Sequence, residues 1–226
     1  MRIDLLTLFP NMFDGVFAES IVKRACDKKL VEIVLTNIRD FARDKHRSVD
    51  DRPYGGGPGM VMMCQPVFDA VESVLKDGPA ADEIILLTPQ GETLNQQTAR
   101  EFAETQRLLL LAGHYEGFDE RIRARLATRE ISIGDYVLSG GEIPAMVVID
   151  TLVRLIPGVL GDSQSMEEES FTENLLEYPQ YTRPENYKDM KVPDVLLSGN
   201  HQKIRTWRQE QSLLRTRSRR PDLKKN

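Results

Sequence analysis

The first 155 residues alternate short apolar runs with longer amphipathic stretches, and this alternation constrains the fold more than any other feature of the sequence. Short apolar runs are typical of buried parallel strands, and stretches with apolar residues three or four apart are typical of the helices that connect them. The predicted strands span 3–8, 32–38, 83–88, 107–112 and 130–133. The predicted helices span 13–28, 66–76, 95–105, 120–127 and 142–155, the first led by a cap signal at Asn11 and the third by one at Asn95. The sequence therefore predicts an α/β fold with a parallel sheet.

The composition excludes several classes of protein. A chain of 226 residues that is 40% hydrophobic and 29% charged is globular rather than disordered or collagen-like. Two cysteines are too few for a disulfide framework, which favours a reducing compartment. The N-terminal run contains Asp4 and no cleavage site, and the longest uncharged stretch is rich in glycine and proline. We therefore expect a cytoplasmic protein with no secretion signal and no membrane helix.

The charge is divided sharply along the C-terminal third of the chain. The net charge is −5, which alone argues weakly against a nucleic-acid partner. Residues 162–200, however, contain nine acids and three bases, whereas residues 201–226 contain nine bases and two acids. A basic segment of this kind can bind a polyanion locally, and a solvated basic tail is the alternative.

The chain is predicted to contain two domains. Pro157 and Gly158 end the last helix of the α/β region, which spans 1–160, and an acidic, serine-rich linker over 161–174 follows. A small, mainly helical domain is expected over 175–226, with a helix that begins after the cap residue Asn200. The predicted apolar stripe of this helix consists of Ile204, Trp207, Gln211 and Leu214.

Three predicted strands are each followed by a turn that contains glycine, at 88–91, 113–117 and 134–141. Such turns emerge at the carboxyl edge of a parallel sheet, so we expect them to converge on one pocket. Glycine lets the backbone approach a ligand closely, which suits recognition of an adenine-like ring. A single turn of this kind also fits a helix cap. The sequence has neither a G-x-x-x-x-G-K-[ST] run nor a G-x-G-x-x-G run after the first strand, which disfavours ordinary nucleotide sites.

The connection over 39–65 is unusually long, and connections of this length are usually functional or disordered. Its first part mixes bases and acids, and its second part, 54–60, is rich in glycine. This mixture favours specific polar contacts with a base or ribose over purely electrostatic binding.

Metal and nucleophile chemistry are poorly supported by the sequence. The three histidines, His46, His114 and His201, are far apart and lack a partner at metal-ligand spacing. Cys26 and Cys64 are better explained as buried, inert thiols than as reactive ones.

Five strings together carry a resemblance to a known family. They are PYGGGPGM at 53–60, LAGHYEGFDER at 111–121, SIGDYVLSGGE at 132–142, YTRP at 181–184 and LSGNH at 197–201. Over essentially the whole chain they resemble the bacterial tRNA (guanine-N1)-methyltransferases, the TrmD type of the SPOUT superfamily. The resemblance implies a deep trefoil knot in the C-terminal part of the α/β domain, an exception to the usual absence of threaded loops.

The resemblance also implies the reaction. S-adenosylmethionine would donate a methyl group to N1 of guanosine 37 in a tRNA that also has guanosine at position 36, giving 1-methylguanosine and S-adenosylhomocysteine. The protein would be a homodimer with each site built from both subunits. The chemistry requires no metal, although assistance by Mg²⁺ at an unidentified site is compatible with the family.

Site residues follow from the same resemblance, position by position. Arg154 matches the catalytic arginine, and His46, Asp50 and Arg52 match the tRNA-contacting segment. We expect the basic C-terminal domain to bind tRNA through Arg217, Arg219 and Arg220. The matches to the cofactor pocket are Leu87, Pro89, Gly113, Tyr115, Glu116, Ile133, Gly134, Tyr136, Val137, Leu138, Gly140, Gly141 and Pro144.

One position departs from the family pattern. The family's general base is an aspartate before Ser-Phe, and Glu169 stands in that place. Glu168 and Asp162 are alternatives, and a solvated acidic stretch without a catalytic role is another. Arg154 has the alternative role of interacting with a helix dipole. Two other functions remain open: methylation of another atom, such as a ribose 2′-hydroxyl, and RNA binding without catalysis.

Overall fold

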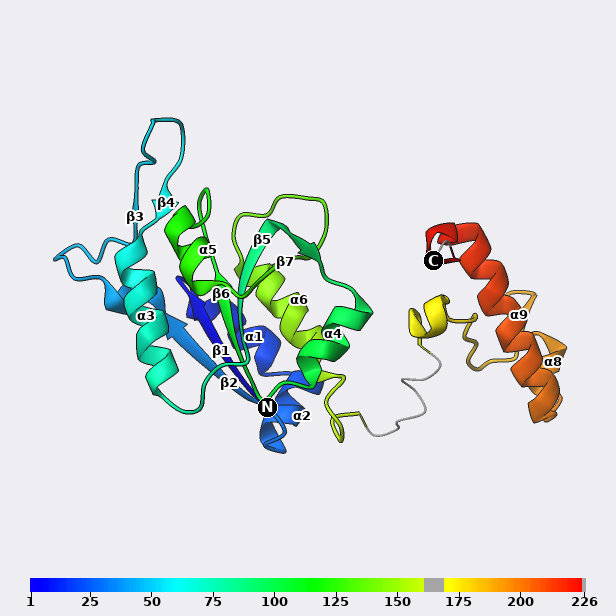
Figure 1. Ribbon diagram of the computed structural model, residues 1–226. Coiled ribbons are helices and arrows are strands. Elements are labelled where there is room, and N and C mark those ends of the chain that lie inside the picture. Colours follow the sequence, from blue (N-terminus) through cyan, green and yellow to red (C-terminus); the bar gives the residue numbers. More distant parts are fainter. Residues whose placement is uncertain (161–168, 225–226) are drawn as a thin grey trace. The chain divides into compact units, whose positions relative to one another are not determined.

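The computed structural model of the chain describes residues 1–160 and 169–224 and separates into two compact units, Met1–Leu160 and Gly161–Asn226 (Figure 1). Each unit is described by itself. No helix in the described ranges combines the length and apolar character that crossing a membrane requires.

The first unit contains a five-stranded sheet in the order β2-β1-β6-β5-β7. Every neighbouring pair of strands is parallel, so the predicted α/β fold with a parallel sheet is confirmed. The strands are β1 (Arg2–Thr7), β2 (Glu32–Asn37), β5 (Glu83–Thr93), β6 (Arg107–Ala112) and β7 (Arg129–Ser132).

Strand β5 is longer than predicted because it pairs with β7 twice. Leu87 lies opposite Ile131, the register then shifts, and Thr93 lies opposite Ser132. The residues at 88–91 therefore bulge out of the sheet instead of ending the strand. This bulge is the first of the three predicted turns, and bulges commonly redirect the backbone next to active sites.

Side chains alternate between two cores on opposite faces of the sheet. Ile3 and Leu5 pack in the first core and Leu6 and Leu8 in the second, as the two-residue period of a strand requires. The first core is covered by α2 (Ser20–Asp27), α4 (Gln96–Ala103) and α6 (Glu142–Val153), and the second by α3 (Cys64–Lys76) and α5 (Glu120–Leu126). Figure 1 shows these two helical layers on either side of the strands.

The prediction of one continuous helix over 13–28 is wrong. The chain forms a 3₁₀ turn, η1 (Pro10–Phe13), then α1 (Asp14–Phe17) and α2. Ser20 has a φ of 55°, in the left-handed region, and one such residue interrupts helical hydrogen bonding. The cap predicted at Asn11 is also wrong, because Asn11 lies inside η1.

A buried ion pair lies at the amino end of the central strands. The side chains of Asp4 on β1 and Arg107 on β6 are 0% and 1% exposed, with Nε 2.8 Å from Oδ2. The remaining guanidinium nitrogens of Arg107 donate to the Val74 and Pro79 carbonyls. This complete set of partners allows a charged pair in the core.

The connection over 39–65 contains η2 (Ile38–Phe41) and an antiparallel hairpin of β3 (Asp50–Asp51) and β4 (Val61–Met62). Four glycines of the hairpin loop have positive φ, a conformation that glycine adopts without steric cost. Tyr54, at the start of this loop, is 100% exposed.

The second unit is mainly helical. It contains η3 (Thr172–Asn174), a small hairpin of β8 (Asn186–Tyr187) and β9 (Met190–Lys191), α8 (Asp194–Leu197), α9 (His201–Arg219) and η4 (Pro221–Lys224). The cap predicted at Asn200 is confirmed, because its Oδ1 accepts a hydrogen bond from the Lys203 N–H at 3.1 Å.

The predicted apolar stripe of α9 is partly wrong. Ile204, Trp207 and Gln211 are half-buried, but Leu214 is 57% exposed. The most buried residues of the helix are Ser212 and Thr216. Polar residues are buried on this face because the segment around Leu176 packs there and the Leu176 N–H donates a hydrogen bond to the Thr216 hydroxyl oxygen.

Candidate active site

The loops that follow β6 and β7 and the bulge of β5 line one cavity of about 350 Å³. These three strands are neighbours in the sheet, so their carboxyl ends lie side by side. The predicted convergence of the three glycine-containing turns is therefore confirmed.

The backbones of the loops approach one another unusually closely. The Gly141 N–H donates to the Gly113 carbonyl at 2.6 Å. A Cβ built on Gly141 would lie 2.7 Å from the Ala112 Cα, and one on Gly91 would lie 2.5 Å from the Glu130 carbonyl. Glycine is required at both positions because no side chain fits between these backbones.

All thirteen residues predicted for the cofactor pocket line this cavity, from Leu87 on β5 to Pro144 on α6. Their binding role remains a prediction. Leu87, Ile133 and Leu138 supply apolar surface, and the glycines expose backbone. Tyr136 packs its ring against Gly134 and donates its hydroxyl to the Ile133 carbonyl at 3.2 Å. A cavity with apolar walls and exposed backbone suits a planar heterocycle with a polar edge.

A buried carboxylate that the sequence analysis missed lies beneath the cavity. Glu142, at the start of α6, is 2% exposed and accepts a hydrogen bond from the Thr7 hydroxyl at 2.8 Å. Its other oxygen lies 3.6 Å from Nδ1 of His114, whose ring packs edge-on against Phe9. The sequence analysis assigns His114 no role other than that of a poorly supported metal ligand. The sequence does contain a signal for Glu142, because this acid directly follows Gly140 and Gly141 and begins a helix, where a negative charge is favoured.

Charged side chains at the rim are partly paired. Arg123 lines the cavity and donates to Glu130 at 2.7 Å and to Gln90 at 2.6 Å. The hydrogen bond with Glu130 raises the pKa of the Arg123 guanidinium above its ordinary value. Glu116 and Glu120 also line the cavity, and Glu120 lies 3.7 Å from the Arg123 guanidinium. These two carboxylates outnumber the one guanidinium among the lining residues, which favours a positively charged ligand.

Asp119 fixes the helix that follows the second loop. Its carboxylate accepts from the backbone N–H of Arg121 at 2.9 Å and pairs with the Arg121 guanidinium at 2.7 Å, forming the N-cap of α5. These bonds hold the pKa of Asp119 well below its usual range, chiefly through the Arg121 side chain.

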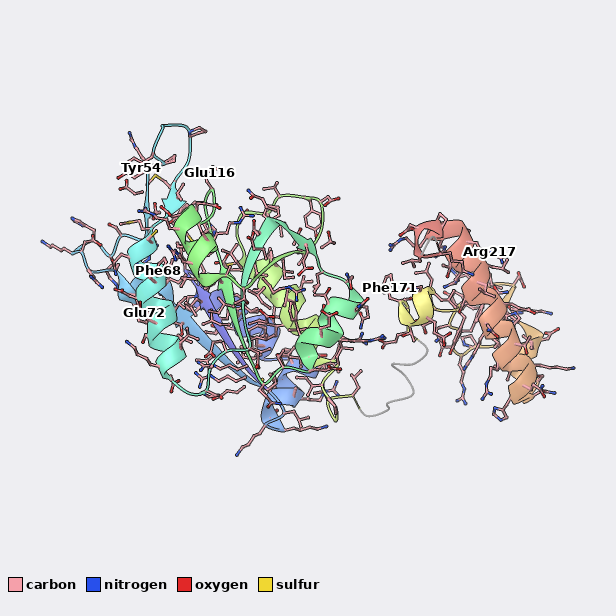
Figure 2. The ribbon with its side chains drawn as sticks, viewed as in Figure 1. Tyr54, Phe68, Glu72, Glu116, Phe171 and Arg217 are labelled. Atoms are coloured by element: carbon pink, nitrogen blue, oxygen red, sulfur yellow. The ribbon has the colours of Figure 1, made fainter. Side chains whose placement is uncertain are left out.

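The glycine-rich hairpin is attached to the same loop. The Glu116 N–H donates to the Met60 carbonyl at 3.0 Å, and the Met62 N–H donates to the Gly117 carbonyl at 2.9 Å. A Cβ on Gly59 would overlap the Glu116 side chain. Figure 2 shows Tyr54 and Glu116 at the same end of the first unit.

The remaining predicted site residues lie outside the cavity lining. Arg154 directly follows α6, and its N–H donates to the Asp150 carbonyl at 3.4 Å. His46 is exposed in the loop before β3, Asp50 lies in β3, and Arg52 follows it. Glu169 belongs to the second unit and immediately precedes a tight turn. The alternatives Glu168 and Asp162 lie outside the described residues.

The three predicted arginines of α9 and its end differ in their surroundings. Arg217 and Arg219 are exposed in the last turn of the helix. Arg220 is also exposed, but its guanidinium binds both carboxylate oxygens of Asp222 and lies 5.9 Å from the Phe171 ring centroid. This pairing makes Arg220 less available to a phosphate than its two neighbours.

Among the described residues, no group of three or more His, Cys, Asp or Glu side chains is arranged to hold a metal ion. Burial raises the pKa of the Cys26 and Cys64 thiols, which lowers their thiolate fraction at neutral pH. Both cysteines are free.

A family model and individual related proteins both match this chain over essentially its full length. The family model for tRNA (guanine-1)-methyltransferase TrmD matches residues 1–226. Proteins named tRNA (guanine-N(1)-)-methyltransferase are similar to this chain: one from Geobacillus kaustophilus is 60% identical over 223 residues, covering 99% of this chain and 91% of the relative. One from Moorella thermoacetica is 58% identical over 224 residues, covering 99% and 90%. The match over the whole length, together with the cavity built by three loops at one sheet edge, shows that the chain belongs to the tRNA (guanine-1)-methyltransferase TrmD family.

Proposed function

We propose that this protein transfers a methyl group from S-adenosylmethionine to N1 of guanosine 37 in tRNA, giving 1-methylguanosine and S-adenosylhomocysteine. The observation that carries the proposal is the family match over all 226 residues of a chain whose glycine loops enclose one cavity. A tRNA substrate also supports a cytoplasmic location of the enzyme.

The cavity suits S-adenosylmethionine in shape and charge. Its apolar walls can enclose the adenine ring, and the glycine backbones can approach the polar edge of that ring. The ligand carries a sulfonium and an ammonium group, and Glu116 and Glu120 supply negative charge at the rim. When bound, S-adenosylmethionine supplies an electrophilic methyl group and leaves as a neutral thioether.

The protein's task is to make N1 of guanine nucleophilic. N1 carries a proton, so its electron pair becomes available only when a base removes that proton. Glu169 accepts the proton, and the negative charge that moves toward O6 is stabilised by the guanidinium of Arg154. The freed N1 pair forms the new bond to the methyl carbon as the carbon–sulfur bond breaks.

A glutamate at the position of the family's aspartate retains the carboxylate and adds one methylene. A misplacement of about 1 Å can reduce a rate about a hundredfold, so the backbone at Glu169 must compensate for the longer side chain. The tight turn that follows Glu169 can set this backbone position, since the Thr172 N–H donates to the Glu169 carbonyl at 3.2 Å.

The tRNA, with guanosines at positions 36 and 37, contacts two parts of the chain. His46, Asp50 and Arg52 bind it next to the glycine-rich hairpin, where polar groups of both signs suit base and ribose contacts. Arg217 and Arg219 bind phosphates, and Arg220 contributes less because Asp222 already pairs with it.

The proposal includes a homodimer and a trefoil knot. Exposed apolar side chains occur on α6, at Ile143 and Val147, and on η1 and α1, at Met12 and Val16. Because η1 contacts both α6 and α1, these side chains support a surface suited to a second copy. The hydrogen bond from Gly141 to Gly113 supports passage of the 134–141 segment closely against the β6 loop, as threading requires. Assistance by Mg²⁺ is not needed for the proton transfer.

The proposal is tested with methyl-labelled S-adenosylmethionine and tRNA transcripts that have guanosine or adenosine at position 37. We expect label on N1 of guanosine 37 and none on the adenosine transcript. Methylation of both transcripts at a ribose 2′-hydroxyl, or binding of tRNA without any transfer, would replace this proposal with one of the two alternatives.

The assignment of the base is tested with Glu169→Gln. A general base contributes about 10²–10⁴-fold to rate, so kcat should fall by roughly that factor. The affinity for S-adenosylmethionine, measured by calorimetry, should stay unchanged. Glu173→Gln is the matched control, because Glu173 is an exposed glutamate of the same turn. Full activity of Glu169→Gln would contradict the assignment.

A further inference from the structure

The segment that begins with Glu169 is fixed to α9 by a buried hydroxyl. The Leu176 N–H donates to Oγ1 of Thr216 at 2.8 Å, and this oxygen donates in turn to the Ser212 carbonyl at 2.7 Å. Thr216 is 0% exposed. Because the hydroxyl proton goes to the helix, a lone pair of Oγ1 is available to accept the Leu176 N–H, and this hydrogen bond specifies where the segment lies on the helix.

The same segment also makes hydrogen bonds within itself. The Phe171 N–H donates to the Leu175 carbonyl at 2.6 Å, and the Glu177 N–H donates to Oγ of Ser170 at 3.0 Å. Three residues that are not glycine, Phe171, Glu173 and Asn174, have left-handed φ values of 73°, 51° and 56°. Such residues persist only where the surrounding structure determines them, and they are common at functional sites.

A second contact joins the turn to the end of α9. The Phe171 ring lies 5.9 Å from the Arg220 guanidinium, and Asp222 holds that guanidinium with hydrogen bonds of 2.7 to 3.1 Å. Figure 2 shows Phe171 at the start of the segment and Arg217 on α9, both in the second unit. The turn is therefore held at its beginning by a cation–π contact and at its end by Thr216.

Thr216 lies among the basic side chains of α9. Arg215, Arg217 and Arg219 flank Thr216 along the last two turns of α9. A hollow of about 500 Å³ is lined by Arg215 and Arg219 from the helix and by Ser170 and Glu177 from the segment. A phosphate bound by these arginines would lie against the turn that follows Glu169.

We propose that Thr216 is a positioning residue, whose hydroxyl fixes the Glu169 segment to the tRNA-binding helix so that tRNA binding sets the position of the base. This inference rests on the proposed function, because it needs Glu169 to accept the N1 proton. The buried Thr216, distant from Glu169 in the sequence, would then affect kcat rather than tRNA affinity.

The test compares Thr216→Val with Thr216→Ser. Valine has nearly the same shape but leaves the Leu176 N–H without its acceptor, whereas serine retains the hydroxyl. We expect kcat of the valine variant to fall about 10–100-fold at saturating tRNA and S-adenosylmethionine, because the base is displaced. The tRNA and S-adenosylmethionine dissociation constants should remain within about twofold of the wild type, and the serine variant should retain most of kcat.

Ser218→Ala is the matched control on the same helix. Its exposed hydroxyl donates to the Arg215 carbonyl at 3.1 Å and does not contact the segment in the described structure. A second variant, Ser170→Ala, removes the acceptor of the Glu177 N–H inside the turn and should reduce kcat in the same way. It keeps the test valid if Thr216→Val does not fold, which thermal unfolding reveals.

A double variant separates positioning from a general structural effect. If Thr216 acts through Glu169, Thr216→Val should slow the Glu169→Gln enzyme no further. The inference is overturned if folded Thr216→Val retains the wild-type kcat, if it loses tRNA affinity in parallel with kcat, or if its effect adds fully to that of Glu169→Gln. An active Glu169→Gln enzyme would instead overturn the proposed base itself, which distinguishes the two failures.

Discussion

Gly141→Ala tests whether the cofactor cavity depends on direct backbone contact between loops. Gly141 has a φ of −81°, so alanine causes no conformational strain and its effect is purely steric. The added Cβ would lie 2.7 Å from the Ala112 Cα, 2.8 Å from the Gly113 N and 3.0 Å from the Ala112 carbonyl carbon. Carbon atoms normally approach to about 3.5–4.0 Å, so the two backbones must separate by roughly 1 Å.

This separation has two measurable consequences. The 2.6 Å hydrogen bond from Gly141 to Gly113 would be lost, and overpacking of this kind costs about 1–3 kcal/mol. We expect the thermal unfolding midpoint to fall by roughly 2–12 °C. Because both glycines line the cavity, the affinity for S-adenosylmethionine, measured by calorimetry on the folded protein, should fall about tenfold or more.

Variants of two other glycines serve as comparisons for Gly141→Ala. Gly15→Ala should lower neither quantity, because a Cβ there has no atom within 4 Å and alanine suits the helix α1 better than glycine. Gly113→Ala would press on the Phe118 ring, a side chain that can rotate, so its effect should be intermediate. A Gly141→Ala protein with the wild-type midpoint and affinity would refute the argument that these backbones must touch.

Two further predictions concern stability. Arg107→Ala removes the buried one of the two guanidinium partners of Asp4, whose carboxylate keeps its 2.8 Å ion pair with Arg2, so the free energy of unfolding in urea should fall by about 1.5–3 kcal/mol. An unchanged value would mean that the ion pair with Arg107 contributes nothing net. Asp119→Ala removes the N-cap of α5 and should cost about 1 kcal/mol at pH 7, whereas Asp119→Asn, another good cap, should cost less. Because the pKa of Asp119 is lower in the folded state than in the unfolded state, its ionic contribution is present above about pH 4 and is lost as the pH falls. Urea titrations at pH 7, 5 and 3 should therefore show the difference between wild type and Asp119→Ala narrowing at acid pH, and a difference independent of pH would contradict this.

Features that depend on local periodicity and helix capping could be predicted from the order of the residues alone. The short apolar run that contains Leu5 and Leu6 predicted a strand buried on both faces, and these two side chains lie in different cores because successive strand residues point to opposite faces. Asn95 and Asn200 were predictable helix caps, since each accepts a backbone N–H from the first turn of its helix. The order of strands and turns also predicted that three loops would meet at one edge.

Which polar groups are buried, and which partners they bind, depends instead on contacts between segments that are distant in the chain. Glu142 and Thr216 would be ordinary surface residues by type, yet each is buried because a partner distant in the chain, Thr7 or Leu176, completes its hydrogen bonding. The second pairing of β5 with β7 and the contact of Gly141 with Gly113 likewise depend on segments brought together by folding. Local patterns record the preferences of neighbouring residues, whereas the burial of a polar group is stable only once its distant partner is in place.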